Sequence, residues 1–126
     1  MRMRQTGFTL VEVLAAVMLL SIGLLAVTAA SKTARQYQER TVYIAVGRNI
    51  AQGRIDKLRS ISIDSLPAQA GTTTSASLPA GNAIQTTVVG YPAAGETDMR
   101  RVVVRVSWPE AGGTRSINYE TLIVRR

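Results

Sequence analysis

An apolar segment near the N-terminus dominates this sequence. Residues 8–30 read FTLVEVLAAVMLLSIGLLAVTAA and contain a single charged side chain, that of Glu12. A helix needs about 20 apolar residues to cross a bilayer, so the length of this segment suits one crossing. Burial inside a protein core is an alternative, but the segment is apolar on every side of a helix, and a domain this small cannot cover it. The segment therefore predicts a transmembrane helix.

A secretory signal peptide is the second alternative for this segment. Residues 28–30, Thr-Ala-Ala, imitate the small residues that precede a signal-peptidase cut. However, a signal peptide has a shorter apolar core, and Glu12 does not suit its interior. The apolar segment also continues into a second helical pattern without an intervening Pro. We therefore expect one helix over residues 9–59, with its first half in lipid.

The second half of this helix is predicted to be amphipathic. Between residues 31 and 60, mostly apolar side chains recur at three- and four-residue spacing and form one stripe, and most basic side chains lie off it. Glycines at positions 23, 47 and 53 are places where the helix can bend. The stripe consists of Ala34, Tyr37, Thr41, Ile44, Ala51, Ile55 and Leu58.

The C-terminal part of the chain has the period-two alternation of β-strands. Apolar and polar side chains alternate around residues 84–89, 101–108 and 117–123, which predicts an antiparallel sheet with one buried face. Residues 109–114, Pro-Glu-Ala-Gly-Gly-Thr, make the last two strands a hairpin. Residues 67–81 are small and polar and are expected to form a loop. The predicted fold class is α+β, a long N-terminal helix packed through its second half on a small antiparallel sheet.

The composition excludes several classes of function. The chain has 126 residues, of which 15 are basic and 8 acidic, giving a formal charge of +7, and it contains neither Cys nor His. The usual zinc sites are therefore nearly excluded, as is catalysis by a His base or a Cys nucleophile. The basic residues are spread along the chain, which is typical of a solvated surface. We expect no metal and no cofactor.

The junction between the basic N-terminus and the apolar segment is the informative site. Residues 1–7 read MRMRQTG, and Arg2 and Arg4 favour a cytoplasmic location for this leader. Gly7 ends the leader, and a glycine lets an extended backbone enter a protease site closely. Removal of the leader leaves 13 basic and 8 acidic residues, a formal charge of +5.

Glu12 is the costly residue of the apolar segment. A carboxylate in hydrocarbon costs about 3 kcal/mol at mid-helix and less near a helix end, so such a residue indicates function. Cleavage before Phe8 creates an amine four residues from Glu12. The amine of one chain can then pair with the Glu12 carboxylate of its neighbour and set their axial register. The alternative is a glutamate that simply snorkels to the headgroups.

This junction, GFTLVEVL at residues 7–14, strongly resembles the cleavage and methylation motif of type IV prepilins and type II secretion pseudopilins. The resemblance implies that a membrane-bound prepilin peptidase cuts after Gly7. It implies that Phe8 becomes the N-methylated first residue of the mature chain. It also implies that Glu12 is the acid needed for assembly.

The resemblance implies three parts of the chain and their location. Residues 1–7 would be a cleaved leader, residues 8–30 a transmembrane and filament-core segment, and residues 31–126 an exported α+β head. The implied location is the bacterial inner membrane, with a cytoplasmic N-terminus and a periplasmic head, and then a pilus or pseudopilus. The implied partners are the prepilin peptidase and sister pilins or pseudopilins, which pack through their N-terminal helices.

Two later stretches resemble minor subunits. Residues 45–60, AVGRNIAQGRIDKLRS, and residues 102–124, VVVRVSWPEAGGTRSINYETLIV, look like parts of minor pilins of the V type and minor pseudopilins of the I type. The chain lacks the Pro that major pilins often have in the apolar helix, and it has no Cys for their C-terminal disulfide. The resemblance therefore implies a non-enzymatic minor subunit of a type IV pilus or a type II secretion pseudopilus.

Two other classes of function stay open at this point. A tip module of a competence or adhesion pilus could contact DNA or a surface, which the charge of +5 permits. No aromatic and basic platform for nucleic acid is evident, because Tyr91, Trp108 and Tyr119 are expected in the sheet core. An enzyme anchored by a signal helix would depend on the hydroxyls of residues 72–75, without a His base.

Overall fold

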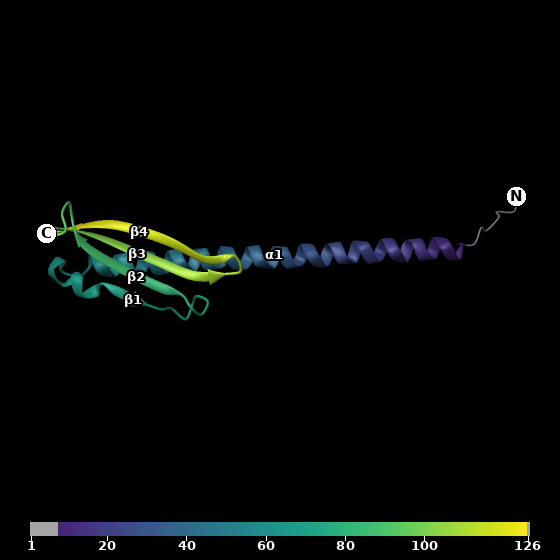
Figure 1. The fold of residues 1–126 in the computed structure, drawn as a ribbon, viewed down its shortest axis with the longest axis horizontal. Helices are drawn as coiled ribbons and strands as arrows, with labels where there is room; N and C mark the ends of the chain where they lie inside the picture. Colours follow the sequence, from purple (N-terminus) through teal and green to yellow (C-terminus); the bar gives the residue numbers. More distant parts are fainter. Residues whose placement is uncertain (1–7, 126) are drawn as a thin grey trace. The chain divides into compact units, whose positions relative to one another are not determined.

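The computed structural model describes residues 8–125. In order along the chain, these residues form a long helix, two short 3₁₀-helices and four strands, as Figure 1 shows. The elements are α1 (Leu10–Arg59), η1 (Ile63–Ser65), η2 (Pro67–Gln69), β1 (Gly71–Thr73), β2 (Ala83–Gly90), β3 (Met99–Glu110) and β4 (Gly113–Val124). The described residues divide into two units, one that ends at Glu39 and one that begins at Arg40.

The second unit is built on a four-stranded antiparallel sheet whose strand order, β1-β2-β3-β4, equals the chain order. The second half of α1 packs on one face of this sheet. On that face, the side chains of Val102, Val104, Val106 and Trp108 are fully buried. The predicted fold class is thus confirmed, a long N-terminal apolar helix packed on an antiparallel sheet in an α+β, pilin-like arrangement.

The predicted stripe of α1 is correct near the end of the helix. Ala51, Ile55 and Leu58 are buried and Ile44 is half-buried against the core, whereas Thr41 is exposed. Ala34 and Tyr37 belong to the first unit, where all described residues are exposed. The core comprises Ala51, Ile55, Leu58, Ile63, Leu66, Leu78, Ile84, Val102, Val104, Val106 and Trp108.

At Gly47, α1 comes close to the side chains of Trp108 and Ile117 in the sheet, and the helix is continuous there. A Cβ atom on Gly47 would lie 2.9 Å from Cζ3 of Trp108 and 3.1 Å from Cδ1 of Ile117. The indole Nε1 of Trp108 donates a hydrogen bond to Oε1 of Glu110 (3.2 Å). Glu110 Oε2 also lies 3.3 Å from Nε of Arg40 in α1. The missing side chain of Gly47 therefore lets the helix lie against the indole ring.

The predicted loop over residues 67–81 contains more structure than its composition indicated. It includes η2 and the short strand β1, in which Thr72 lies opposite Gln85 of β2. The buried amide of Asn82 holds the rest of this segment. Its Oδ1 accepts the backbone N–H of Ser75 (2.8 Å), and its Nδ2 donates to the carbonyls of Ser75 (2.9 Å) and Pro79 (2.8 Å). The segment is thus held by the hydrogen bonds of one polar side chain together with the buried side chain of Leu78.

The end of β4 is fixed by an ion-pair cluster around Arg125. Its guanidinium binds both carboxylate oxygens of Asp64 in η1, at 2.6 and 3.2 Å, and Nε lies 3.0 Å from Oδ1 of Asp98. The backbone N–H of Arg125 also donates to the carbonyl of Asp98 (2.8 Å). Hydrogen bonding to Asp64 raises the pKa of Arg125 above its usual value, so the guanidinium stays charged throughout the physiological range.

Candidate functional site

The first turn of α1 begins directly after Thr9. The Thr9 carbonyl accepts the backbone N–H groups of Glu12 (3.0 Å) and Val13 (3.2 Å), and the Thr9 hydroxyl lies 3.3 Å from the Glu12 nitrogen. Thr9 is therefore the N-cap of the helix, and the helix starts one residue later than predicted. Thr-x-x-Glu is the spacing of a capping box, a sequence signal that marks this boundary.

The structure describes only one side of the predicted cleavage site, the side that begins with Phe8. Gly7 and the leader, with Arg2 and Arg4, lie outside the described residues. Phe8 precedes the helix by two residues, and its side chain is 81% exposed. The backbone on the described side of the expected cut is thus non-helical and its first side chain is open to a partner.

The first unit exposes a long apolar surface. From Leu10 to Val27, every large apolar side chain is more than half exposed. Among the described residues, α1 is the helix long and apolar enough to cross a membrane, a criterion of length and composition. Exposure of so much apolar surface is unfavourable in water, which indicates that a membrane or other helices cover it. A buried core helix, the first alternative, does not fit this half of α1.

The polar hydroxyls of this apolar helix are satisfied within it. Ser21 donates to the carbonyl of Val17 (2.8 Å), and Ser31 donates to that of Val27 (2.9 Å). Thr28 makes the same kind of bond to an upstream carbonyl, at 2.8 Å. Hydroxyls bonded in this way suit a nonpolar surrounding, because they leave no donor unpaired.

Glu12 stands apart from these hydroxyl groups. Among the described residues, no cation forms an ion pair with its exposed carboxylate, and within residues 8–30 it is the only charged side chain. It lies in the first turn of α1, where the positive end of the helix dipole stabilises an anion. The Glu12 carboxylate is therefore without an ion-pair partner among the described residues.

The aromatic residues of the head follow the sequence prediction in two of three cases. Trp108 is fully buried and Tyr119 is half-buried on the inner face of the sheet. The prediction for Tyr91 is wrong, because this side chain is 40% exposed beyond the end of β2. The loop after β2 folds back so closely on Gly90 that a Cβ there would lie 2.6 Å from the carbonyl oxygens of Ala93 and Glu96. This reversal turns Tyr91 away from the core.

No group of three or more acidic side chains that could hold a metal ion occurs within residues 8–125. The hydroxyl-rich residues 72–75 have structural partners instead. Thr72 and Thr73 lie in β1, and the Ser75 hydroxyl accepts the backbone N–H of Ser77 (3.2 Å).

Comparison with known proteins gives a family-model match at the N-terminus of the chain. Residues 2–28 match the family model of the prokaryotic N-terminal methylation motif. No curated protein and no solved structure matches the chain. The motif belongs to structural subunits, and it implies processing by a prepilin peptidase and assembly with other pilins. The chain therefore carries the N-terminal methylation signal of type IV prepilin-like proteins at the start of α1.

Proposed function

We propose that this chain is a minor subunit, a minor pilin or pseudopilin, of a type IV pilus or a type II secretion pseudopilus. The methylation motif, placed at the start of a helix whose first half exposes more than half of every large apolar side chain, carries this proposal. The absence of Pro from the apolar helix and of Cys from the chain favours a minor over a major subunit. In this proposal residues 1–7 are the cytoplasmic leader, residues 8–30 the inner-membrane anchor and residues 31–126 the exported head.

The first step of the proposed function is cleavage between Gly7 and Phe8, followed by methylation of the Phe8 amine. The exposed Phe8 side chain and the non-helical backbone before α1 support it, because a peptidase binds its substrate in an extended form. The cut leaves the mature chain with a cationic amine four residues before Glu12, at the first turn of the helix.

Mass spectrometry of the mature N-terminus tests this step in cells that contain the peptidase. We expect a chain that begins with methylated Phe8. Gly7→Val should leave an uncut, membrane-held precursor, since a branched side chain blocks the close approach of the backbone. Gly23→Val is the matched control, because a side chain at Gly23 meets no other atom within 4 Å. A mature chain that begins after Ala30 would contradict the proposal.

The second step is assembly, in which Glu12 pairs with the Phe8 amine of a neighbouring chain. Inside a membrane this pairing offsets the cost of the carboxylate and fixes the axial position of one helix against the next. The apolar side chains that surround Glu12 on α1 supply no competing cation.

Crosslinking between helices separates this role from that of a snorkelling carboxylate. Glu12→Leu should leave membrane insertion and cleavage intact and should lower incorporation beside sister subunits. Glu12→Gln is the companion variant, because it keeps the size and the hydrogen-bonding groups and removes only the charge. Normal crosslinking in both variants would show that Glu12 is a bystander. Loss in the Leu variant alone would assign the role to hydrogen bonding and not to charge.

A further inference from the structure

The last strand of the head leaves a long edge of the sheet open. β4 pairs with β3 alone, over 12 residues, whereas the opposite edge strand β1 has three. The hydrogen bond from the Arg125 N–H to the Asp98 carbonyl fixes which residues of β4 bond to β3, because such pairs alternate along antiparallel strands. Ser116, Asn118, Glu120, Leu122 and Val124 therefore direct their backbone N–H and C=O groups to the open side.

This edge has few of the devices by which soluble proteins protect edge strands, since its charged side chains are those of Arg115 and Glu120. Gly113–Val124 contains neither Pro nor Lys, and the strand is long. Near its end the side chains become apolar, with Leu122 47% and Val124 53% exposed. Among the described residues, no hydrogen bond reaches the outward backbone groups of this part of β4. The complement of such a row of alternating donors and acceptors is the backbone of another extended strand.

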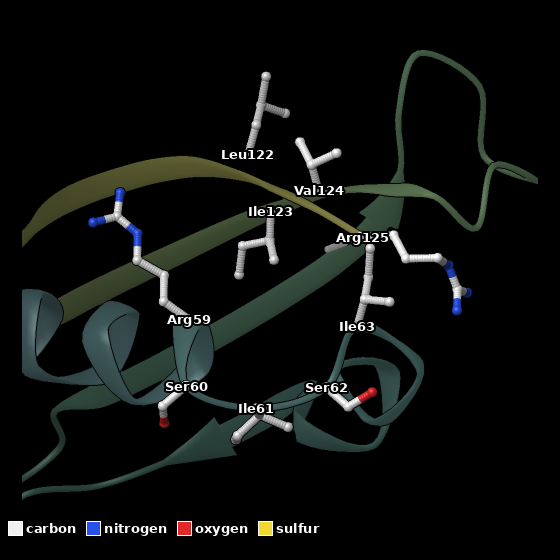
Figure 2. A pocket seen from close by; sticks show the side chains of 9 residues that line it. All are labelled: Arg59, Ser60, Ile61, Ser62, Ile63, Leu122, Ile123, Val124 and Arg125. Carbon is white, nitrogen blue, oxygen red and sulfur yellow. The ribbon is translucent and has the colours of Figure 1, made fainter.

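Two hollows run along the junction between α1 and β4. The larger, of about 590 Å³, lies between residues 59–63 and the end of β4 at residues 122–125. In Figure 2, the Arg59 side chain extends from the end of α1 toward β4, and Leu122 and Val124 point to the opposite side of the strand from Ile123. The second hollow, of about 350 Å³, also has Arg59 in its wall, together with Tyr119, Thr121 and the two acidic residues Asp56 and Glu120. Arg59 thus lies where the two hollows meet.

The charge of the larger hollow is positive. Its lining contains two guanidinium groups, those of Arg59 and Arg125, and no carboxylate. Arg125 is already paired with Asp64 and Asp98. Arg59 donates a hydrogen bond to the Thr121 hydroxyl (2.8 Å), and no carboxylate of the described residues forms an ion pair with it. On the side of the larger hollow, an acidic group is therefore the complement of Arg59, whereas the second hollow already contains Asp56 and Glu120.

We propose that the open edge of β4 between Asn118 and Val124 is a docking site for an extended strand of a partner protein, with an acidic side chain that meets Arg59. The partner strand continues the sheet through the outward backbone groups of β4. A second copy of this chain is not the occupant. Antiparallel pairing of two β4 edges would reverse the second half of α1 between the copies, whereas subunits anchored side by side in one membrane, as proposed above, share one direction.

Binding of designed strands to the full chain in detergent micelles tests this proposal without knowledge of the natural partner. The probe is a synthetic peptide of about ten alternating Thr and Val residues with one central Glu, a length suited to a strand. Its matched controls carry Lys in place of Glu, or methyl groups on the backbone nitrogens. Residue-resolved amide hydrogen exchange is the measurement, with the Ile123 amide as internal reference because it already bonds to β3.

The Glu peptide should slow exchange at Leu122 and Val124 and leave Ile123 unchanged. It should bind about threefold to tenfold more tightly than the Lys peptide. The Glu side chain forms an exposed ion pair with Arg59, whereas the Lys side chain is repelled by it. Arg59→Glu should reverse this preference, while Arg48→Glu, at an exposed position of α1 outside both hollows, should not. The N-methylated peptide should give no protection.

Three results would overturn the proposal. The first is no protection of Leu122 and Val124 by the Glu peptide at millimolar concentration. The second is equal binding of the N-methylated peptide, and the third is an unchanged preference in Arg59→Glu. Unchanged exchange at Val104 in the core verifies the fold of each variant. The experiment uses the uncut chain, so a failure here leaves cleavage at Gly7, and with it the proposed function, untouched.

Discussion

The two halves of α1 are parts of one continuous helix, yet their apolar side chains differ in burial. Leu10 to Val27 expose every large apolar side chain, while Ala51, Ile55 and Leu58 are buried under the sheet. Apolar content alone therefore does not identify the buried half. The first half is apolar all round and needs an external cover, whereas the second half has one apolar stripe that matches one sheet face. The glycines show the same contrast, because a Cβ meets no other atom at Gly23 and meets Trp108 at Gly47.

The largest expected effect comes from the side chain that the second half covers. Trp108→Ala should lower the free energy of unfolding of the head by about 3–5 kcal/mol, since it removes the largest fully buried side chain. Chemical denaturation of the full chain in detergent, followed by circular dichroism of the sheet, measures this change. The control is Tyr91→Ala at an exposed loop position, where a change below about 0.5 kcal/mol is expected. Equal effects of the two variants would mean that the indole is not the centre of the core.

Substitutions at Gly47 and Gly23 compare the packed half of α1 with its exposed half. Gly47→Ala should destabilise the head by about 1–3 kcal/mol, because the new methyl group overlaps the indole ring and Ile117. Gly23→Ala, with open space around it, should leave the head unchanged. The fluorescence of Trp108, the only tryptophan of the chain, reports the unfolding of both variants. If Gly47→Ala proved as harmless as Gly23→Ala, the close approach of α1 to Trp108 would be wrong.

The smallest effect is expected for the ion pairs at the start of the second half. Glu110→Gln removes the charge that Arg40 (3.3 Å) and Arg115 (3.4 Å) face, and it keeps an acceptor for the indole N–H. The loss should be below about 1 kcal/mol and should shrink as salt is added. Glu120→Gln is the matched control, because its ion pair is longer (3.8 Å) and more exposed. A loss in Glu110→Gln that salt does not reduce would assign the effect to packing.

Much of the fold could be predicted from the sequence, because side chains on one face of the sheet recur with period two. The alternation in residues 101–108 placed Val102, Val104, Val106 and Trp108 on the inner face, where they are buried. The strand β1 was missed, since Gly71–Thr73 has no apolar side chain and depends on the pairing offered by β2. Such pairing is a tertiary property, which local composition does not record.

The candidate site was predictable in its chemistry and less so in its geometry. The match to the methylation motif at residues 2–28 confirms the prepilin-like signal that the sequence indicates, whereas the roles of Gly7, Phe8 and Glu12 stay predictions. The predicted helix includes Thr9, which is the N-cap in the structure, although the Thr-x-x-Glu spacing is typical of an N-cap. The sequence indicates only that the helix can bend at Gly47, because it shows the missing side chain and not the indole ring that lies in its place.

The order of the strands in the sheet has a consequence for how the head folds. Each of β2, β3 and β4 pairs with the strand that precedes it in the chain, so no pairing joins strands that are distant in the sequence. If the N-terminus stays in the cytoplasm, as proposed, and the head is exported in chain order, the stripe of α1 emerges before any strand. The sheet can then grow strand by strand on that helix as residues arrive. Loop closure is cheap at every step, because partners are close in sequence. The same direction of growth leaves β4 as the last strand to arrive and its outer edge as the last surface to be covered.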